Sequence, residues 1–346
     1  MTTPQAAPTL RQFMEGLQPG DPIGHLNLTL VPLRGGRREH LNYVLSADAL
    51  STGTLAITEI SEGGSVPELL AVNQGLHMIL LLDGEELVGA KQNRILNTTV
   101  LLPPQSKTKI PVSCVEQGRW RHVSAEFSAG NYSPAKLRAR KSRDVSRNLA
   151  ASGMAQSDQG AVWDEVHENV VLYQAAAPTM AMHDVYEQRQ DLFDAYVKAL
   201  IYPEDARGVV VAIGGKFVAV DLFDKPGTLT SLWSRLIVGY AVDAAALAKA
   251  KGKKSDSFTA KGAAMLLEHV GEIVCRPCPS VGVGEDWRFE AEDVLGQALI
   301  AEGQCVHLSA FPNEATGRQQ DPGSCILPPS SRRRTRRNPP PDERVY

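Results

Sequence analysis

Two turn signals lie close together in residues 79–120, and they constrain the fold more than any other part of the sequence. Four apolar residues run into Asp83 and Gly84, and the stretch PPQSK at residues 103–107 turns the chain back again. Short apolar runs bounded by Gly, Pro and Asp are typical of antiparallel strands. We therefore predict two consecutive hairpins in this segment.

A dense run of polar side chains lies inside this two-hairpin unit, at Lys91, Gln92, Asn93 and Arg94. In strand geometry Lys91 and Asn93 share one face, and Gln92 and Arg94 share the other. Polar groups in a core destabilise the fold unless they are hydrogen-bonded, and they are otherwise kept where they serve a functional site. We predict a functional site here. The alternative is a buried network of ion pairs and amides that stabilises the β-rich region.

Side-chain chemistry assigns candidate roles within this site. A carboxylate beside a cation can serve in acid–base catalysis, and a thiol can be a nucleophile if a neighbour such as His77 or His122 lowers its pKa. The catalytic candidates are Glu86, Lys91, Cys114 and Glu116. Arginine can grip a phosphate, and tryptophan can stack on a base. The ligand-binding candidates are Glu85, Gln92, Asn93, Arg94, Arg119 and Trp120. Packing is the alternative role for Cys114, because free cysteines are usually buried.

The periodicity of the apolar residues changes along the chain and predicts an α+β fold, with a β-rich N-terminal half. Strand-like patterns cover residues 23–33, 55–60, 69–73 and 78–82, with a turn at Gly63 and Gly64. Helical spacing covers residues 134–149, 161–173, 178–200, 226–250 and 260–269. Gly214 and Gly215 predict a tight hairpin over residues 209–223, around which the helices pack. Short closing strands are expected at residues 272–276, 287–290, 295–301 and 305–311.

Composition divides the chain into three parts: a lead-in at residues 1–19, one domain at 20–312 and a tail at 313–346. The domain is β-rich over residues 20–130 and mixed helix and hairpin over 131–312. The tail is rich in Arg and Pro and is predicted to be disordered. It holds seven Arg against four acidic residues, so the chain's net charge of -3 leaves -6 on the body. Nucleic-acid binding by the folded body is therefore not favoured.

Basic residues nevertheless gather in the predicted helix at residues 134–149. This helix is a candidate for phosphate or nucleic-acid binding, although a solvated basic face is the simpler interpretation. Arg288, which follows the glycine turn at Gly282 and Gly284, is a candidate anion contact. The helix and the Arg-rich tail are the basis for a third class of function, a structural or nucleic-acid-associated protein.

Cysteine usage predicts a reducing cytoplasm, because the five cysteines are few and odd in number. Cys275 and Cys278 form a lone CxxC, and a structural zinc ion needs further ligands. Cys305 and His307 are the candidates to supply them, but we assign no metal site and identify no cofactor. No apolar run approaches the roughly 18 residues of a membrane helix, and the N-terminus lacks the pattern of a secretory signal, so no membrane association is expected.

Several sequence blocks carry a family resemblance: DGEELVGAKQNRI, IPVSCVEQGRW, VVVAIGGKFVAVDLF and VHLSAF. Together they resemble the ARG and rhodanese-phosphatase-superfamily-associated protein domain, over roughly residues 20–311. The resemblance implies an association with ADP-ribosylglycohydrolases and rhodanese-type phosphatases, and hence ADP-ribose, NAD or phosphate-ester metabolism. The resemblance does not assign a catalytic role to any residue of this chain. The expected function is action on, or binding of, an ADP-ribose- or NAD-related or phosphorylated small molecule. The alternative is a non-catalytic module that senses a ligand or binds a partner.

Overall fold

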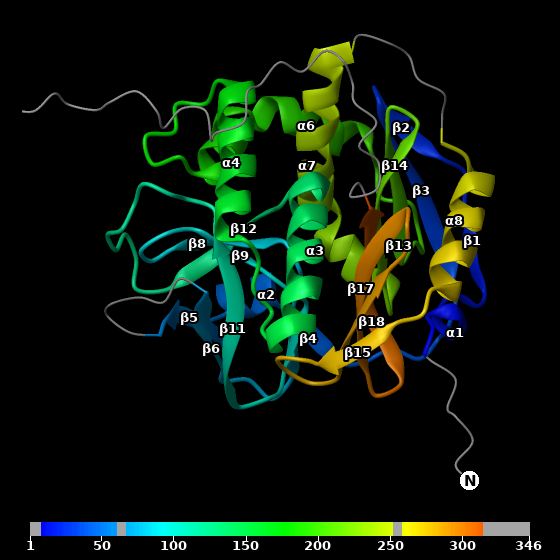
Figure 1. The fold of residues 1–346 in the computed structure, drawn as a ribbon, viewed down its shortest axis with the longest axis horizontal. Helices are drawn as coiled ribbons and strands as arrows, with labels where there is room; N and C mark the ends of the chain where they lie inside the picture. Colours follow the sequence, from blue (N-terminus) through cyan, green and yellow to red (C-terminus); the bar gives the residue numbers. More distant parts are fainter. Residues whose placement is uncertain (1–7, 61–66, 252–257, 314–346) are drawn as a thin grey trace, which may run out of the picture. The chain divides into compact units, whose positions relative to one another are not determined.

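The predicted α+β class is confirmed: a β-rich N-terminal half is followed by helices and closing strands (Figure 1). The computed structural model describes residues 8–60, 67–251 and 258–313, with the side chains of 249–251 excepted. The described residues belong to one compact unit that ends at Asn313. The predicted turn at Gly63 and Gly64 and the Arg-rich tail lie outside the described residues.

The largest sheet joins N-terminal strands to the closing strands, in the order β1-β3-β13-β14-β18-β17-β16-β15, with β2 paired to β3. All of its pairs are antiparallel. The predicted hairpin at its centre is confirmed, and both Gly214 and Gly215 have positive φ, as such a tight turn requires. The strands are β1 (Leu17–Pro19), β2 (Ile23–His25), β3 (Leu28–Gly35), β13 (Gly208–Ile213), β14 (Lys216–Phe223), β15 (Arg276–Pro279), β16 (Glu285–Glu290), β17 (Val294–Ala301) and β18 (Gln304–Pro312).

The N-terminal half of the described chain also forms two smaller sheets, ordered β12-β8-β9-β11-β6-β5 and β10-β7-β4. Pro111 lies inside β11, at the point where that strand changes partner from β6 to β9. Proline is tolerated there because a ladder donor is not needed at the change. The strands are β4 (Tyr43–Leu45), β5 (Leu55–Glu59), β6 (Glu68–Asn73), β7 (Met78–Leu81), β8 (Glu85–Gly89), β9 (Arg94–Leu96), β10 (Val100–Leu102), β11 (Ser106–Cys114) and β12 (Phe127–Tyr132).

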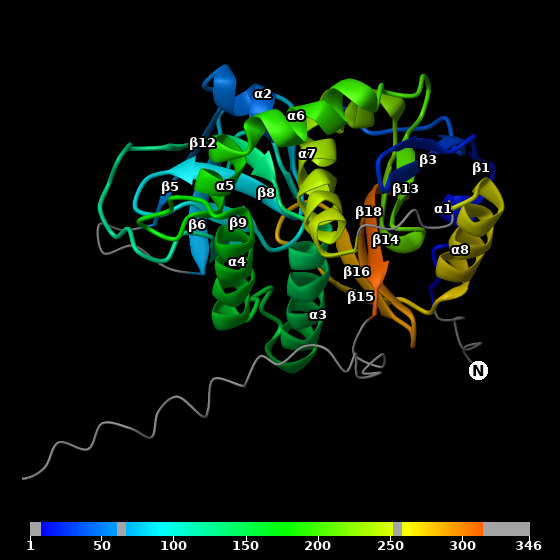
Figure 2. The same ribbon diagram turned by 90° about the horizontal axis from the view of Figure 1, so that it is seen from above.

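Two helices, α3 and α7, lie between the smaller sheets and the largest one in both views (Figure 1, Figure 2). Helix α3 packs on β14, β17 and β18, and α7 contacts β12 on one side and β13 on the other. The helices are α1 (Arg11–Met14), α2 (Ser46–Ser51), α3 (Ala135–Ser152), α4 (Gln159–Tyr173), α5 (Met182–Gln188), α6 (Gln190–Ala199), α7 (Pro226–Lys251) and α8 (Ala260–Glu272).

The two hairpins predicted in residues 79–120 do not form. The turn at Asp83 and Gly84 joins β7 to β8, and the turn at 103–107 joins β10 to β11, but in each case the two strands lie in different sheets. Strand β8 pairs with β9 instead.

The bounds of other elements also differ from the sequence prediction. The strand expected at residues 23–33 is a hairpin, because Leu26 takes a φ of 53° between β2 and β3. The helix expected at 178–200 breaks at Arg189, whose Nε donates to the Tyr173 carbonyl at 2.8 Å and so ties the break to the end of α4. The strand expected at 272–276 begins only at Arg276.

Helix α3 corrects the expectation of a solvated basic face. Arg138 and Lys141 are fully buried, and Ser142 and Val145 continue the same buried stripe at helical spacing. Lys141 Nζ donates to Asp83 and, at 2.6 Å, to the Leu96 carbonyl. Burial lowers the pKa of Lys141 to about 8. The sequence displays the positive charges of this helix but not the acidic partners, which come from distant strands and turns.

Candidate functional site

The first three residues of the polar run connect β8 to β9 and are not part of a strand, and Arg94 begins β9. Ala90 takes a φ of 41°, and Lys91, Gln92 and Asn93 lie in the bend that follows it. The predicted alternation of faces therefore does not apply. Nine of the ten candidate side chains are buried, and Trp120 is 51 % exposed. The structure distributes the candidates over several contact groups.

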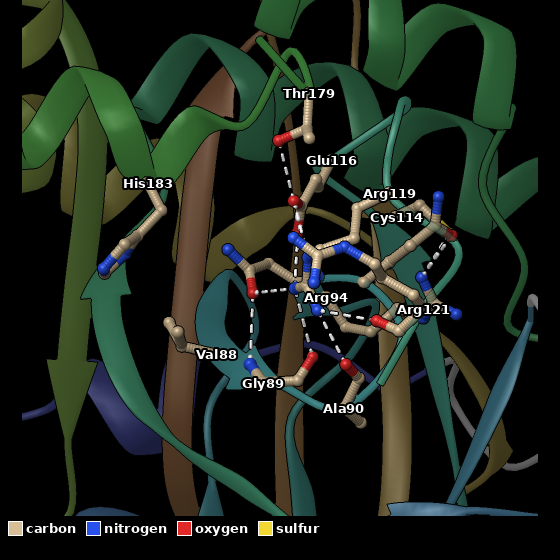
Figure 3. Close-up of polar contacts among 12 residues, drawn as sticks. Val88, Gly89, Ala90, Arg94, Cys114, Glu116, Arg119, Arg121, Thr179 and His183 are labelled. Atoms are coloured by element: carbon tan, nitrogen blue, oxygen red, sulfur yellow. Dashed lines mark hydrogen bonds and ion pairs between the residues drawn. The ribbon is translucent and has the colours of Figure 1, made fainter. Parts of the chain in front are cut away.

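The Glu116 group consists of Glu116, Arg119, Asn93 and Thr179 (Figure 3). Arg119 donates from Nε to Glu116 Oε1 at 2.7 Å and from Nη2 to Oε2 at 2.6 Å. Its Nη2 also reaches Asn93 Oδ1 at 3.0 Å, and Thr179 donates to Glu116 at 2.8 Å. Burial alone would raise the pKa of Glu116, but the hydrogen bonds from Arg119 and Thr179 lower it. Glu116 is therefore a fixed anion and a poor proton donor.

The Cys114 group joins Cys114 to Arg94 and Gln92. Arg94 Nη1 lies 2.6 Å from the sulfur and 2.9 Å from Gln92 Oε1, and the thiol donates to the same Gln92 oxygen at 3.3 Å. Burial raises the pKa of the Cys114 thiol to about 11, although the Arg94 charge opposes the rise. Among the described residues, the hydrogen-bond partners of this sulfur are Arg94 and Gln92, and neither His77 nor His122 is among them. The environment favours packing over nucleophilic catalysis.

The Glu86 group contains His183, which the sequence did not single out. His183 Nδ1 lies 3.1 Å from Glu86 Oε2, and the backbone N–H of Asn131 donates to the same oxygen at 3.0 Å. The His183 side chain is 24 % exposed, whereas Glu86 is buried. The hydrogen bond to Glu86 raises the pKa of His183 despite partial burial. A lone histidine in a helical stretch gives no sequence signal of this pairing.

Glu85 and Lys91 lie apart from these groups. Glu85 Oε1 accepts from Ser46 at 2.6 Å and from Arg235 at 3.0 Å, so this carboxylate connects α2 and α7. The buried Lys91 Nζ lies 5.6 Å from the ring centroid of the half-exposed Trp120, a cation–π distance.

Backbone contacts hold the loop after β11 against the segment that leads into α5. Gly118 N–H donates to the Thr179 carbonyl at 2.8 Å, and Met182 N–H donates to the Val115 carbonyl at 3.0 Å. These contacts hold the Glu116 group against the segment that leads into α5, the helix that carries His183, and Figure 3 shows His183 to one side of this group.

The cysteine motif does not form a metal centre in the described part of the chain. No group of three or more His, Cys, Asp or Glu side chains there is arranged to hold an ion. His307, the candidate fourth ligand, is within hydrogen-bonding distance of Thr99 at 2.7 Å and Asp221 at 3.3 Å instead. We therefore place no metal in the site.

Comparison with known proteins gives one finding. The family model described as the ARG and Rhodanese-Phosphatase-superfamily-associated Protein domain matches residues 16–311. No curated protein and no solved structure matches the chain. Among the described helices, none has both the length and the apolar character needed to cross a bilayer.

Proposed function

The chain belongs to the ARG and Rhodanese-Phosphatase-superfamily-associated Protein domain family, and on this premise we propose that it binds and acts on a small phosphorylated ligand of the ADP-ribose class. The observation that carries the proposal is the contact between Glu86 and His183. The ligand class rests on the association that the family description states. His183 is the proposed proton-transferring group, and Glu86 is the residue that positions it.

A buried carboxylate paired with a partly exposed imidazole is an arrangement suited to general acid–base catalysis. The carboxylate fixes the orientation of the ring and favours its protonated form. The other ring nitrogen lies 3.6 Å from the exposed Glu187 carboxylate, beyond hydrogen-bonding distance, and a substrate in its place would receive or give the proton. Cys114 and Glu116 are less suited, because the first has a raised pKa and the second is held as an anion by Arg119. The geometry therefore favours Glu86 among the four catalytic candidates.

The loop after β11 supplies features for recognising a nucleotide-like ligand. Trp120 exposes half of its surface, and exposed aromatic faces stack well on bases. Arg121 is exposed beside it, and a guanidinium matches the oxygen geometry of a phosphate. The free cysteines of the described chain support the proposed cytoplasmic location.

A non-catalytic sensing module is the second candidate. The observation that favours it is the extensive mutual pairing of the predicted site residues, which resembles a rigid scaffold more than a reactive centre. In this alternative the Trp120 loop binds the ligand or a partner, and His183 stabilises the fold without transferring protons.

The test combines ligand binding with turnover. Thermal unfolding would be followed with ADP-ribose, NAD and AMP, and product formation would be followed by chromatography. An enzyme should show turnover that falls at least about 100-fold in His183→Gln, the usual contribution of acid–base catalysis, with binding retained. Glu187→Gln is the matched control, because this exposed carboxylate lies 3.6 Å from the other ring nitrogen. Binding without turnover would favour the sensing module, and no stabilisation by any of the three ligands would overturn both candidates.

A further inference from the structure

A pocket of about 300 Å³ lies between the C-terminal half of α3 and the strands β15 and β16. Its lining includes three arginines, Arg147 from α3, Arg276 from β15 and Arg288 from β16. Phe289 supplies an apolar wall, and Glu290 is the acidic residue of the lining. A volume of this size is at the lower end of small-molecule sites. None of the residues of the proposed acid–base site takes part in it.

Arg288 is an arginine whose hydrogen-bonding capacity is partly unused. It is 3 % exposed, and its Nη2 donates to Asp286 at 2.6 Å and to Thr98 at 2.7 Å. Its Nε and Nη1 have no hydrogen-bond partner among the described residues. The same holds, within the described chain, for Nε2 of Gln297, which lies directly opposite on β17. These atoms are all donors with almost no exposed surface, and they lie behind the accessible wall of the pocket.

The register of β15 and β16 places Arg276 directly opposite Arg288. Like charges at directly opposed positions of an antiparallel pair destabilise the pairing. Asp286 offsets part of the Arg288 charge, and Glu290 Oε1 accepts a hydrogen bond from Asn313 at 3.2 Å. Arg147, which is exposed on α3, adds a third positive charge. An anion in this pocket would offset the repulsion among these positive charges.

We propose that this pocket binds the phosphate group of a small phosphorylated ligand. Arginine forks bind phosphate oxygens bidentately, which matches the exposed guanidinium groups of Arg147 and Arg276. The buried Arg288 adds a positive charge behind them. The volume suits a phosphate with a group of sugar size next to Phe289, and it is small for a dinucleotide. The proposal does not rest on the proposed acid–base function.

Calorimetric titration at constant ionic strength tests the site, with inorganic phosphate, ribose 5-phosphate and ribose as probes. Arg147→Gln and Arg276→Gln are suitable variants because both side chains are exposed, and each should weaken binding of the phosphorylated probes about tenfold. Arg140→Gln is the matched control on the same helix: Arg140 is 39 % exposed and lies 3.8 Å from Glu165. It should bind like the wild type, and ribose should not bind.

The different probes show whether the ligand is a phosphate monoester or the free phosphate anion. Tighter binding of ribose 5-phosphate identifies a phosphate monoester as the ligand, and equal or tighter binding of inorganic phosphate identifies the free anion. Phosphate binding that is absent, or equal in the wild type and in the Arg147→Gln/Arg276→Gln double variant, would overturn the proposal. His183→Gln should bind both phosphorylated probes normally, so that failure of this site and failure of the acid–base site can be told apart.

Discussion

Arg138 holds both carboxylate oxygens of Asp221 in the protein interior, at 2.9 and 2.6 Å, and neither side chain is exposed. The pair joins α3 to β14. Arg138 Nε also lies 3.5 Å from Asp83, in the turn between β7 and β8, so one guanidinium connects the N-terminal sheets to the largest sheet. Burial alone would raise the pKa of Asp221, but Arg138 and His307 hold it well below its usual range.

The first prediction is that Arg138→Gln destabilises the protein by about 3–5 kcal/mol, because it leaves a buried carboxylate without its cation. Denaturant unfolding would measure this loss. Arg140 lies on the same helix but is 39 % exposed, so Arg140→Gln should change the free energy of unfolding by less than about 0.5 kcal/mol. Equal effects of the two substitutions would show that the buried pair does not connect the sheets energetically.

The second prediction concerns the pH dependence of the Glu86–His183 pair. The folded pKa of His183 is raised above the usual 6.5. A raised pKa means that the folded state binds the proton more tightly than the unfolded state. The pair therefore contributes its full stability below the unfolded pKa and loses it as pH rises through the folded pKa.

Unfolding of the wild type and His183→Gln would be compared from about pH 5.5 to about pH 8.5, the range in which histidine titrates. The difference in free energy of unfolding between the two proteins should shrink as pH rises. Glu187→Gln should leave this dependence largely in place, because the hydrogen bond to Glu86 is the main cause of the shift. A difference that is constant or grows with pH would contradict the assignment.

Local signals in the sequence were sufficient for much of the fold. Gly214 and Gly215 between two apolar runs predict the β13–β14 hairpin, because a tight turn with positive φ at both central residues favours glycine. The break in the first predicted strand was not predictable in this way. There the positive φ falls on Leu26, an apolar residue that rarely adopts it.

The candidate site was predictable only in part, because its pairs join residues far apart in sequence. Glu86 and His183 are separated by 97 positions, and Glu85 and Arg235 by 150. A single sequence shows that such residues are polar but not which of them meet. The prediction that side chains of the polar run alternate between two faces of a strand was wrong for a local reason. The chain turns at Ala90, and the three residues that follow are not in a strand.

The third prediction concerns Asp243 at the N-terminus of α3. Pro134, the residue before this helix, provides no side-chain cap, and Asp243 Oδ2 on α7 instead accepts from Lys136 N–H at 3.0 Å. Asp243→Ala should cost about 1 kcal/mol, the typical value of a lost cap, whereas Asp243→Asn keeps an acceptor and should cost less. Chemical denaturation would measure both.

Burial raises the pKa of Asp243 from 3.8 to about 7. The unfolded chain loses this proton at lower pH than the folded protein, so stability should fall as pH rises across that interval. Asp243→Asn should remove this part of the dependence of the free energy of unfolding on pH. An unchanged slope in the variant would show that Asp243 does not titrate in the folded protein as expected.

The fourth prediction is that Cys114 reacts slowly with alkylating reagents in the native protein. The thiolate is the reactive form, and burial raises the pKa of Cys114 to about 11, so little thiolate is present near neutral pH. Peptide mass spectrometry after iodoacetamide treatment would compare native and denaturant-unfolded protein, with the unfolded sample as the control for complete labelling. Arg94→Gln should not accelerate the reaction, because the Arg94 charge lowers the thiol pKa and its removal raises that pKa further. Rapid native labelling of Cys114 would instead restore it as a candidate nucleophile and weaken the assignment of proton transfer to His183.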